Sequence, residues 1–331
     1  MVQVLEQVLR LGRRGKLLRP FCQARQVQPR GYSRRLQRIL TDFGADDSFG
    51  TAAAKVLEHY AIEVPVSAVR KHTLVHGRAI AATTDKPLYK PAGQITTGMD
   101  GSMIPIMEPG SGADQRKGKK LLWREARLCC ARATGREQAC YGVTLGSTEV
   151  AGWMWHQTAK MAGLTRETDV HGVGDGAPWI GEQFENHFGD QGTYLIDFYH
   201  VSEYLAAAAL KVARPGKERQ WLHCQQGRLL QNKASKVLRA LEPYFEAEGT
   251  PEAPVQAAFR YLSERRPYLD YAGARAKGLP IGSGEVESGH RHVVQQRLKL
   301  SGCWWKETNA QSMLNLRTAR ANELWEHYWL N

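Results

Sequence analysis

The sequence predicts an α/β fold built around one mixed sheet. Two observations support this: strand-forming runs begin at Gln94, and helical and strand-forming segments then alternate. The first three runs are joined by turn residues and one basic loop, so they should pair as an antiparallel meander. Strands are expected at 95–106, 126–132, 138–145, 169–173 and 194–198, with helices at 149–162 and 178–187. Three hairpin-joined strands followed by helix, strand, helix and strand is the order of an RNase H-like sheet, with three antiparallel strands and then two parallel ones.

The residues before this sheet carry most of the positive charge. Lys and Arg exceed Asp and Glu by 45 to 33, a net charge of +12, and residues 1–40 hold ten basic residues and one acid, Glu6, which is 10 − 1 = +9. Such an arm attracts a polyanion, and we favour nucleic acid as the partner. A solvated tail and an Arg-rich organelle transit peptide are alternatives for the same composition.

Two short helices are expected in the N-terminal region. Apolar residues at three- and four-residue spacing predict a helix over 47–60, capped by Asp47 or Ser48. After a turn, Ser67 can cap a second helix that runs to His76.

The pair can form a helix-turn-helix, in which the second helix reads the major groove of DNA. Arg70 and Lys71 would then face outward on that helix. Two such helices also occur in ordinary helical packing. Turn-forming residues at 78–93 place a domain boundary near 90, which gives a basic, helical DNA-binding region over 1–90.

Strand signals disappear after the sheet. Residues 202–270 place Leu, Ala, Tyr and Trp at helical spacing, so an all-α insertion is expected over 202–275. The sheet domain would then comprise 91–201 and 276–331, closing with helices at about 282–300 and 309–329.

The cysteines and the hydropathy of the sequence indicate the cellular compartment. The six cysteines show no CxxC spacing, and with no secretory signal they predict reduced thiols in a cytoplasmic protein, with neither a disulfide framework nor a zinc cluster. No apolar run approaches the roughly 18 to 20 residues that cross a bilayer, so no membrane span is expected.

Three carboxylates occupy positions that should converge in such a sheet. Asp100 lies in the first strand, Asp175 follows the fourth, and Glu287 lies on the helix after the insertion. Glycines flank both aspartates closely, which would let a substrate approach. A carboxylate is costly to bury unless it is paired or metal-bound, although Gly-Asp-Gly is also a common turn and a Glu near a helix start also favours the macrodipole.

The chemistry that fits this set is metal-dependent phosphodiester transfer. Two Mg²⁺ or Mn²⁺ ions about 3.5 to 4 Å apart can activate a water or a 3′-hydroxyl and stabilise the leaving oxygen. Hard oxygen ligands suit these ions, so acidic residues are what this chemistry needs.

Four ordered blocks of the sequence resemble a known family. They are Gly98-Met99-Asp100-Gly101, residues 171–180 (HGVGDGAPWI), residues 195–203 (LIDFYHVSE), and residues 279–287 with the Arg297-Leu298-Lys299, Ser301-Gly302 and Trp304-Trp305 that follow. Together they resemble the DDE transposases of bacterial insertion sequences, in particular the Kra family, relatives of the Mutator-like group. The resemblance covers about residues 34–330.

The resemblance implies an RNase H-like catalytic domain, interrupted by a helical insertion before the final glutamate, that cleaves and joins DNA at element ends. Asp100 and Asp175 match the first two metal ligands of the family. For the third, Glu285 and Glu287 lie about 200° apart around a helix, so only one should enter the site. We choose Glu287, because related families place theirs in a Glu-Ser pair like Glu287-Ser288.

Asp197 and His200 match an Asp-x-x-His motif that accompanies the triad in the wider group. They would orient a ligand or the scissile phosphate near the metal ions. The alternative is a helix cap beside a satisfied histidine.

Further basic residues are candidates for phosphate contacts. A loop between the first two strands carries Arg116, Lys117, Lys119 and Lys120, and the helix after Glu287 carries Arg297 and Lys299. A charge run is also compatible with a merely solvated loop. Trp304 and Trp305 are more typical of a core than of base stacking.

The sequence thus predicts a transposase that hydrolyses phosphodiesters at the terminal inverted repeats of its element and joins the freed 3′-hydroxyl to target DNA. It would act as a homodimer or larger complex, because two DNA ends must be paired, in the cytoplasm of a bacterium at the nucleoid. One rival is a domesticated DNA-binding protein or non-transposing nuclease. Another is a glycoside hydrolase using two carboxylates, which leaves the basic arm unexplained.

Overall fold

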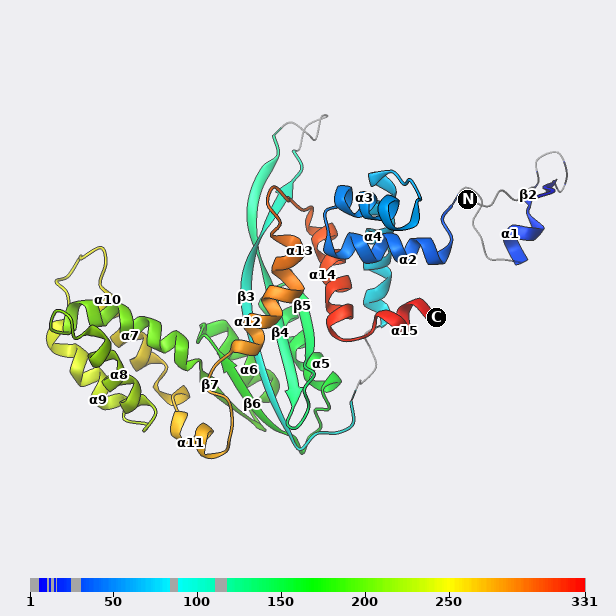
Figure 1. The fold of residues 1–331 in the computed structure, drawn as a ribbon. Helices are drawn as coiled ribbons and strands as arrows, with labels where there is room; N and C mark the ends of the chain where they lie inside the picture. The colour runs from blue at the N-terminus through cyan, green and yellow to red at the C-terminus, as the bar shows by residue number, and fades with distance from the viewer. Residues whose placement is uncertain are drawn as a thin grey trace. The chain divides into compact units, whose positions relative to one another are not determined.

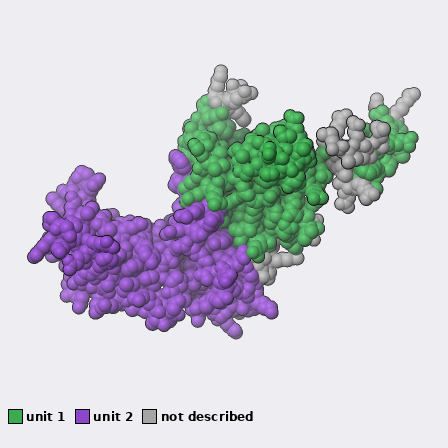
Figure 2. Space-filling model, in the orientation of Figure 1, with its two compact units in different colours: residues 1–84, 105–122, 293–331 green, residues 85–104, 123–292 purple. Residues whose placement is uncertain are grey.

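The structure, a computed structural model, describes residues 6–10, 12, 15, 17–24, 31–83, 89–110 and 118–330. The chain divides into two compact units, coloured separately in Figure 2. Unit 1 comprises Met1–Thr84, Pro105–Leu122 and Val293–Asn331, and unit 2 comprises Asp85–Ile104 and Trp123–His292. No helix within these described ranges has both the length and the apolar character of a membrane span.

A five-stranded sheet organises unit 2 (Figure 1). Its strand order is β5-β4-β3-β6-β7, with β6 parallel to both β3 and β7 and β5 antiparallel to β4. The mixed α/β sheet expected from the sequence is therefore confirmed. The strands are β3 (Gln94–Glu108), β4 (Lys120–Ala133), β5 (Cys140–Thr144), β6 (Asp169–Gly174) and β7 (Gly192–Ile196).

One face of the sheet is covered by α5 (Thr148–Met161) and α6 (Pro178–Phe188). Their aromatic side chains Trp155, Phe184 and Phe188 pack into one buried cluster with apolar residues of the strands. The Trp155 indole donates a hydrogen bond of 2.5 Å to Thr97 Oγ1 of β3, so its polar atom is satisfied inside this core.

A run of helices follows β7 in unit 2, over the residues where the all-α insertion is expected. Its first helix begins at Phe198, earlier than the helical pattern at 202 indicated, because the Asp197 side chain caps it. Its helices pack around a separate core that includes Leu205, Val237 and Leu262. They are α7 (Phe198–Val212), α8 (Glu218–Leu229), α9 (Ala234–Leu241), α10 (Pro254–Glu264) and α11 (Tyr271–Ala276), with short 3₁₀ turns at Glu242–Tyr244 and Arg266–Tyr268.

Three helices form the N-terminal core of unit 1: α2 (Arg34–Asp46), α3 (Phe49–Tyr60) and α4 (Val66–Ala79). Ser48 caps α3 as expected, but α4 begins after Pro65, so the expected cap at Ser67 is wrong. Proline is tolerated at the start of a helix because the first amides of the helix have no intrahelical partner. A 3₁₀ turn, Ile80–Thr83, follows α4.

Part of the basic arm is helical, because α2 contains Arg34, Arg35 and Arg38. Before it lie the short pair β1 (Leu9–Arg10) and β2 (Leu17–Leu18) and the helix α1 (Pro20–Ala24). Other basic residues of the arm lie outside the described residues, namely Arg13, Arg14, Lys16, Arg25 and Arg30.

The two closing helices are each interrupted. The expected helix at 282–300 is divided into α12 (Gly284–Gly289), a π-helical turn (His290–Gln295) and α13 (Gln296–Leu298). The expected helix at 309–329 is divided into α14 (Glu307–Ala321) and α15 (Trp325–Leu330). Glu323 stands between the last two with a φ of 58°, a left-handed conformation that ends a helix.

His76 in unit 1 gives the first testable prediction. Its Nε2 lies 2.9 Å from Gln37 Oε1 and its Nδ1 lies 2.7 Å from the Tyr328 hydroxyl. Burial, with smaller effects of His72 and Arg34, lowers the pKa of His76 to about 4. The unfolded chain therefore binds an extra proton between about pH 6.5 and pH 4, so stability falls as the pH falls through this window.

Between pH 7.5 and pH 4.5, the free energy of unfolding of His76→Gln should fall by about 2 kcal/mol less than that of the wild type. Urea unfolding of both proteins at the two pH values measures this. His59→Gln, at an exposed histidine of α3, is the control and should keep the wild-type dependence. Equal pH dependence in wild type and His76→Gln would contradict the prediction.

Candidate active site

Asp100 lies on the face of the sheet opposite α5 and α6. Side chains alternate along a strand, and Met99 faces the core beneath these helices, so Gly98 and Asp100 face the other way. There Gly98 packs against Val286 of α12, because a Cβ added to Gly98 would lie 2.6 Å from Val286 Cγ2. The amide of Gly101 donates a hydrogen bond of 2.7 Å to Asp100 Oδ1.

The parallel pairing of β3 with β6 brings Asp175 to the same level. Gly98 and Val173 are the last register partners of this pair, and Asp100 and Asp175 each follow two residues later. Neighbouring strands are about 4.8 Å apart. Asp175 also comes directly after the carboxyl end of β6, where ligands commonly bind in α/β sheets. Its Oδ1 accepts a hydrogen bond of 2.8 Å from the amide of Ala177.

The pKa of Asp100 is raised mainly by burial and to a smaller extent by neighbouring acids. Burial is the largest effect and raises this pKa to about 6; the Gly101 hydrogen bond and His200 lower it, while Asp175 and Glu125 raise it. Like charges held near one another in a half-buried site favour a cation between them. Carboxylate oxygens are the ligands that Mg²⁺ and Mn²⁺ take, so the donor chemistry of Asp100 and Asp175 fits such an ion.

Glu285 and Glu287 lie on different sides of α12, as their spacing predicts. Glu285 accepts a hydrogen bond of 2.7 Å from Arg132 Nε of β4 and forms a salt bridge with it. Glu287 is exposed, three residues before His290, whose Nε2 lies 3.0 Å from the Asp100 carbonyl oxygen and 3.6 Å from Asp100 Oδ2. Residues three apart share a helix face, so Glu287 is on the side of α12 that leads to Asp100.

The structure brings the aspartates together but not the full triad. Within the part of the chain that the structure describes, no three His, Cys, Asp or Glu side chains gather closely enough to hold a metal ion.

Asp197 joins two segments that are distant in sequence. Its Oδ1 caps α7 by accepting the amides of Tyr199 (2.6 Å) and His200 (3.1 Å). Its Oδ2 accepts the Ser283 amide at 2.6 Å and also the Ser283 hydroxyl. The carboxylate is almost fully buried, at 2% exposure, and it ties the start of α7 to the segment before α12. His200 lies 3.6 Å from Glu203 and acts electrostatically on Asp100.

The expected DNA-binding residues fall into three groups. Arg70 and Lys71 are exposed on α4, and Lys119, Lys120 and Lys299 are also exposed. Arg116 and Lys117 lie outside the described residues.

Arg297 is the third group, and its burial argues against the expected phosphate contact. It is 1% exposed, donates from Nε to the Gly44 carbonyl (3.1 Å), and lies over the Phe49 and Trp305 rings at 4.9 and 4.8 Å. A guanidinium between two rings in a core stabilises the packing of unit 1. Trp305 is likewise buried, as its aromatic character predicts, but Trp304 is exposed, so the expected core position is wrong for Trp304.

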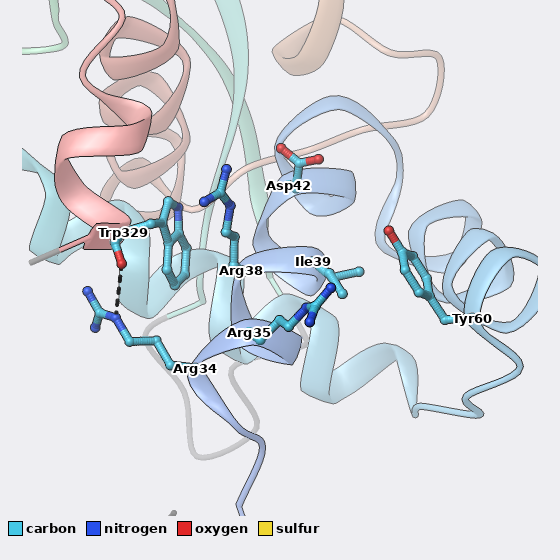
Figure 3. Close-up of a pocket in the computed structure, with 7 residues that line it drawn as sticks. All are labelled: Arg34, Arg35, Arg38, Ile39, Asp42, Tyr60 and Trp329. Atoms are coloured by element: carbon cyan, nitrogen blue, oxygen red, sulfur yellow. Dashed lines mark hydrogen bonds between the residues drawn. The ribbon is translucent and has the colours of Figure 1, made fainter. Parts of the chain in front are cut away.

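Unit 1 contains an arginine-rich pocket that the sequence did not predict (Figure 3). It measures about 560 Å³, and Arg34, Arg35 and Arg38 line it together with Tyr60 and Trp329. Arg34 donates to the carbonyl oxygens of Trp329 and Tyr328, at 3.5 and 3.0 Å, while Arg38 pairs with Glu326. Ser33 with the apolar spacing of Leu36, Ile39, Leu40 and Phe43 is the signal that reveals the helix.

Comparisons with known proteins give distant similarities. No protein-family model matches it. A Streptococcus gallolyticus protein named "UPF0236 protein in vanSb 3′region" is 27% identical over 182 residues, which cover 50% of this chain and 36% of that protein. The chain thus spans little more than a third of the length of this curated relative. Among solved structures, the strand transfer complex of the Drosophila P element transposase has a TM-score of 0.37 and 10% identity, covering 94% of this chain and 84% of that one.

The packing of Gly98 against Val286 gives a second prediction. A methyl group at residue 98 would meet Val286 Cγ2 at 2.6 Å and the Val173 carbonyl oxygen at 2.8 Å. Because a backbone carbonyl cannot move aside cheaply, Gly98→Ala should lower the free energy of unfolding by about 1–3 kcal/mol. Chemical denaturation of the full chain measures it. Gly93→Ala, where an added Cβ meets no atom within 4 Å, is the matched control. If Gly98→Ala and Gly93→Ala lower the free energy of unfolding equally, the contact between β3 and α12 tolerates a side chain at residue 98.

Proposed function

We propose that this protein is a metal-dependent DNA transposase with an RNase H-like catalytic domain. The observation that carries the proposal is the pairing of Gly98 with Val173, which sets Asp100 of β3 level with Asp175, the residue directly after the neighbouring parallel strand β6. The strand order and the helices on the sheet are compatible with the RNase H-like assignment. The further assignment to relatives of the Kra family rests on the sequence blocks around Asp100, Asp175, Asp197 and Glu287.

Each acidic residue has a proposed role. Asp100 and Asp175 would hold the divalent cations, and Glu287 would complete the set from α12. Bound Mg²⁺ or Mn²⁺ would activate the attacking water or 3′-hydroxyl and stabilise the leaving oxygen. Asp197 holds the Ser283 segment, and with it α12, against the start of α7. His200 supplies a side chain near Asp100 that can face the scissile phosphate.

DNA binding is proposed for the basic surfaces of unit 1. Exposed Arg70 and Lys71 of α4, with Lys119, Lys120 and Lys299, would contact phosphates, and Arg116 and Lys117 belong to the same proposal. We retain the division into a DNA-binding region (1–90), a catalytic domain (91–201 and 276–331) and an insertion (202–275). The DNA would be the terminal repeats and the target, bound by a homodimer or larger complex in the bacterial cytoplasm.

The catalytic proposal predicts a specific pattern among four variants. Asp100→Asn, Asp175→Asn and Glu287→Gln should each reduce Mg²⁺- or Mn²⁺-dependent nicking of DNA carrying the element's ends by roughly a hundredfold or more. Glu285→Gln is the matched control, because Glu285 is engaged by Arg132, and it should keep nicking within about threefold. A gel assay with end-labelled DNA measures all four. Nicking that survives Glu287→Gln but not Glu285→Gln would reverse the assignment of the third carboxylate. Nicking that survives both aspartate changes would refute the proposal.

Binding to DNA can be tested separately on α4. The double variant Arg70→Gln, Lys71→Gln should weaken binding and lower the slope of log K against log salt by about one for each phosphate that the variant no longer neutralises. Fluorescence anisotropy at several salt concentrations, with end DNA and random DNA, measures both quantities. Weaker binding to both DNAs would indicate that the two residues bind phosphates, and weaker binding to end DNA alone would indicate base reading. Unchanged binding and slope would remove these residues from the interface.

A further inference from the structure

The end of α10 in the insertion contacts the loop that carries Asp175. The Tyr261 hydroxyl donates a hydrogen bond to the Asp175 carbonyl oxygen. Arg265, which follows α10, donates from Nε to the Gly176 carbonyl oxygen at 2.7 Å. Two donors of the insertion therefore bind two consecutive carbonyls, one on the proposed metal ligand itself and one on its neighbour.

The loop between β6 and α6 conforms closely to these donors. Gly176 has a φ of 81°, which favours glycine, and a Cβ added there would lie 2.9 Å from both Cδ and Nε of Arg265. The arginine stem therefore rests directly on the loop backbone. Inside the loop, the Ala177 amide holds Asp175 Oδ1 at 2.8 Å. Because both the peptide and one carboxylate oxygen are held, the orientation of the Asp175 side chain depends on the position of this backbone.

The donors are themselves held in place. Tyr261 is 6% exposed, and its ring stacks on Tyr204 of α7 with centroids 4.2 Å apart and planes at 15°. The Arg265 guanidinium lies over the same Tyr261 ring, 4.4 Å from its centroid. His200 contacts the Tyr261 ring edge-on at 5.8 Å. An aromatic stack between α7 and α10 thus fixes both donors relative to the insertion.

We propose that Tyr261 and Arg265 are positioning residues that orient the Asp175 carboxylate for cation binding. This inference rests on the proposed function. Simple anchorage of the insertion to the sheet would need apolar packing alone, and the insertion core already provides it through Leu205, Leu262 and Leu195 of β7. What the two donors add is control of the two consecutive peptides that follow the Asp175 Cα.

The test is Mn²⁺ binding to the full chain, measured by isothermal titration calorimetry, alongside DNA nicking. Tyr261→Phe keeps the stacked ring and removes only the hydroxyl, and Arg265→Lys keeps the charge and removes Nε. Each should weaken Mn²⁺ binding about tenfold, as loss of groups that orient a ligand does. The kcat of nicking should fall while KM for DNA is unchanged. Tyr271→Phe is the matched control, because Tyr271 is fully buried in the same core and its hydroxyl has no hydrogen-bond partner among the described residues.

Thermal unfolding of each variant separates positioning from folding. If the variants lose stability but bind Mn²⁺ like wild type, the two hydrogen bonds are only structural and the inference is overturned. Wild-type affinity in Tyr261→Phe and Arg265→Lys would overturn it as well. Wild type should bind Mn²⁺, and Asp175→Asn should abolish that binding. If either result is not seen, the proposed function fails, and this inference fails with it. Weaker binding in the two variants but not in Tyr271→Phe is the result expected.

Discussion

The parallel register between β3 and β6 is the constraint on which the rest of unit 2 depends. It sets Gly98 opposite Val173 and so places two aspartates at one level, two residues further along each strand. Side chains alternate between the two faces of β3, so Gly98 faces α12, where the absence of a side chain lets Val286 approach. A one-residue slip would turn Asp100 into the apolar core beneath α5 and α6 and expose Met99 instead. One register therefore determines both the packing of Gly98 against α12 and the position of the two aspartates.

A second level of organisation comes from polar groups that bridge long sequence separations. Asp197 accepts hydrogen bonds from both α7 and Ser283, and His290 reaches back to Asp100. Buried carboxylates persist where their oxygens are well satisfied, and Asp197 accepts four donors. The insertion contributes in the same way through Tyr261 and Arg265, although its apolar core is separate from that under α5 and α6.

The sequence was sufficient for features that depend on local pattern. Turn residues and alternation predicted every strand of the five-stranded sheet. It failed where tertiary packing decides. The dense arginines of α2 obscured the apolar spacing of Leu40 and its neighbours, and Arg297 appeared basic and accessible although two rings enclose it. The hydrogen bonds of Tyr261 and Arg265 join residues 86 and 89 positions apart, and no spacing within the sequence reports them.

The bond between Asp197 and Ser283 also has a consequence for synthesis of the chain. Its partners are 86 residues apart, with the whole insertion between them. At roughly 5–20 residues per second, several seconds pass between the emergence of Asp197 from the ribosome and that of Ser283 and α12. During this interval the strands that carry Asp100 and Asp175 can pair, but the helix that faces them has not yet been made. The sheet therefore has time to fold before α12, which carries Glu287, leaves the ribosome, and Asp197 keeps its α7 amide partners but lacks its Ser283 partner until the insertion has been translated.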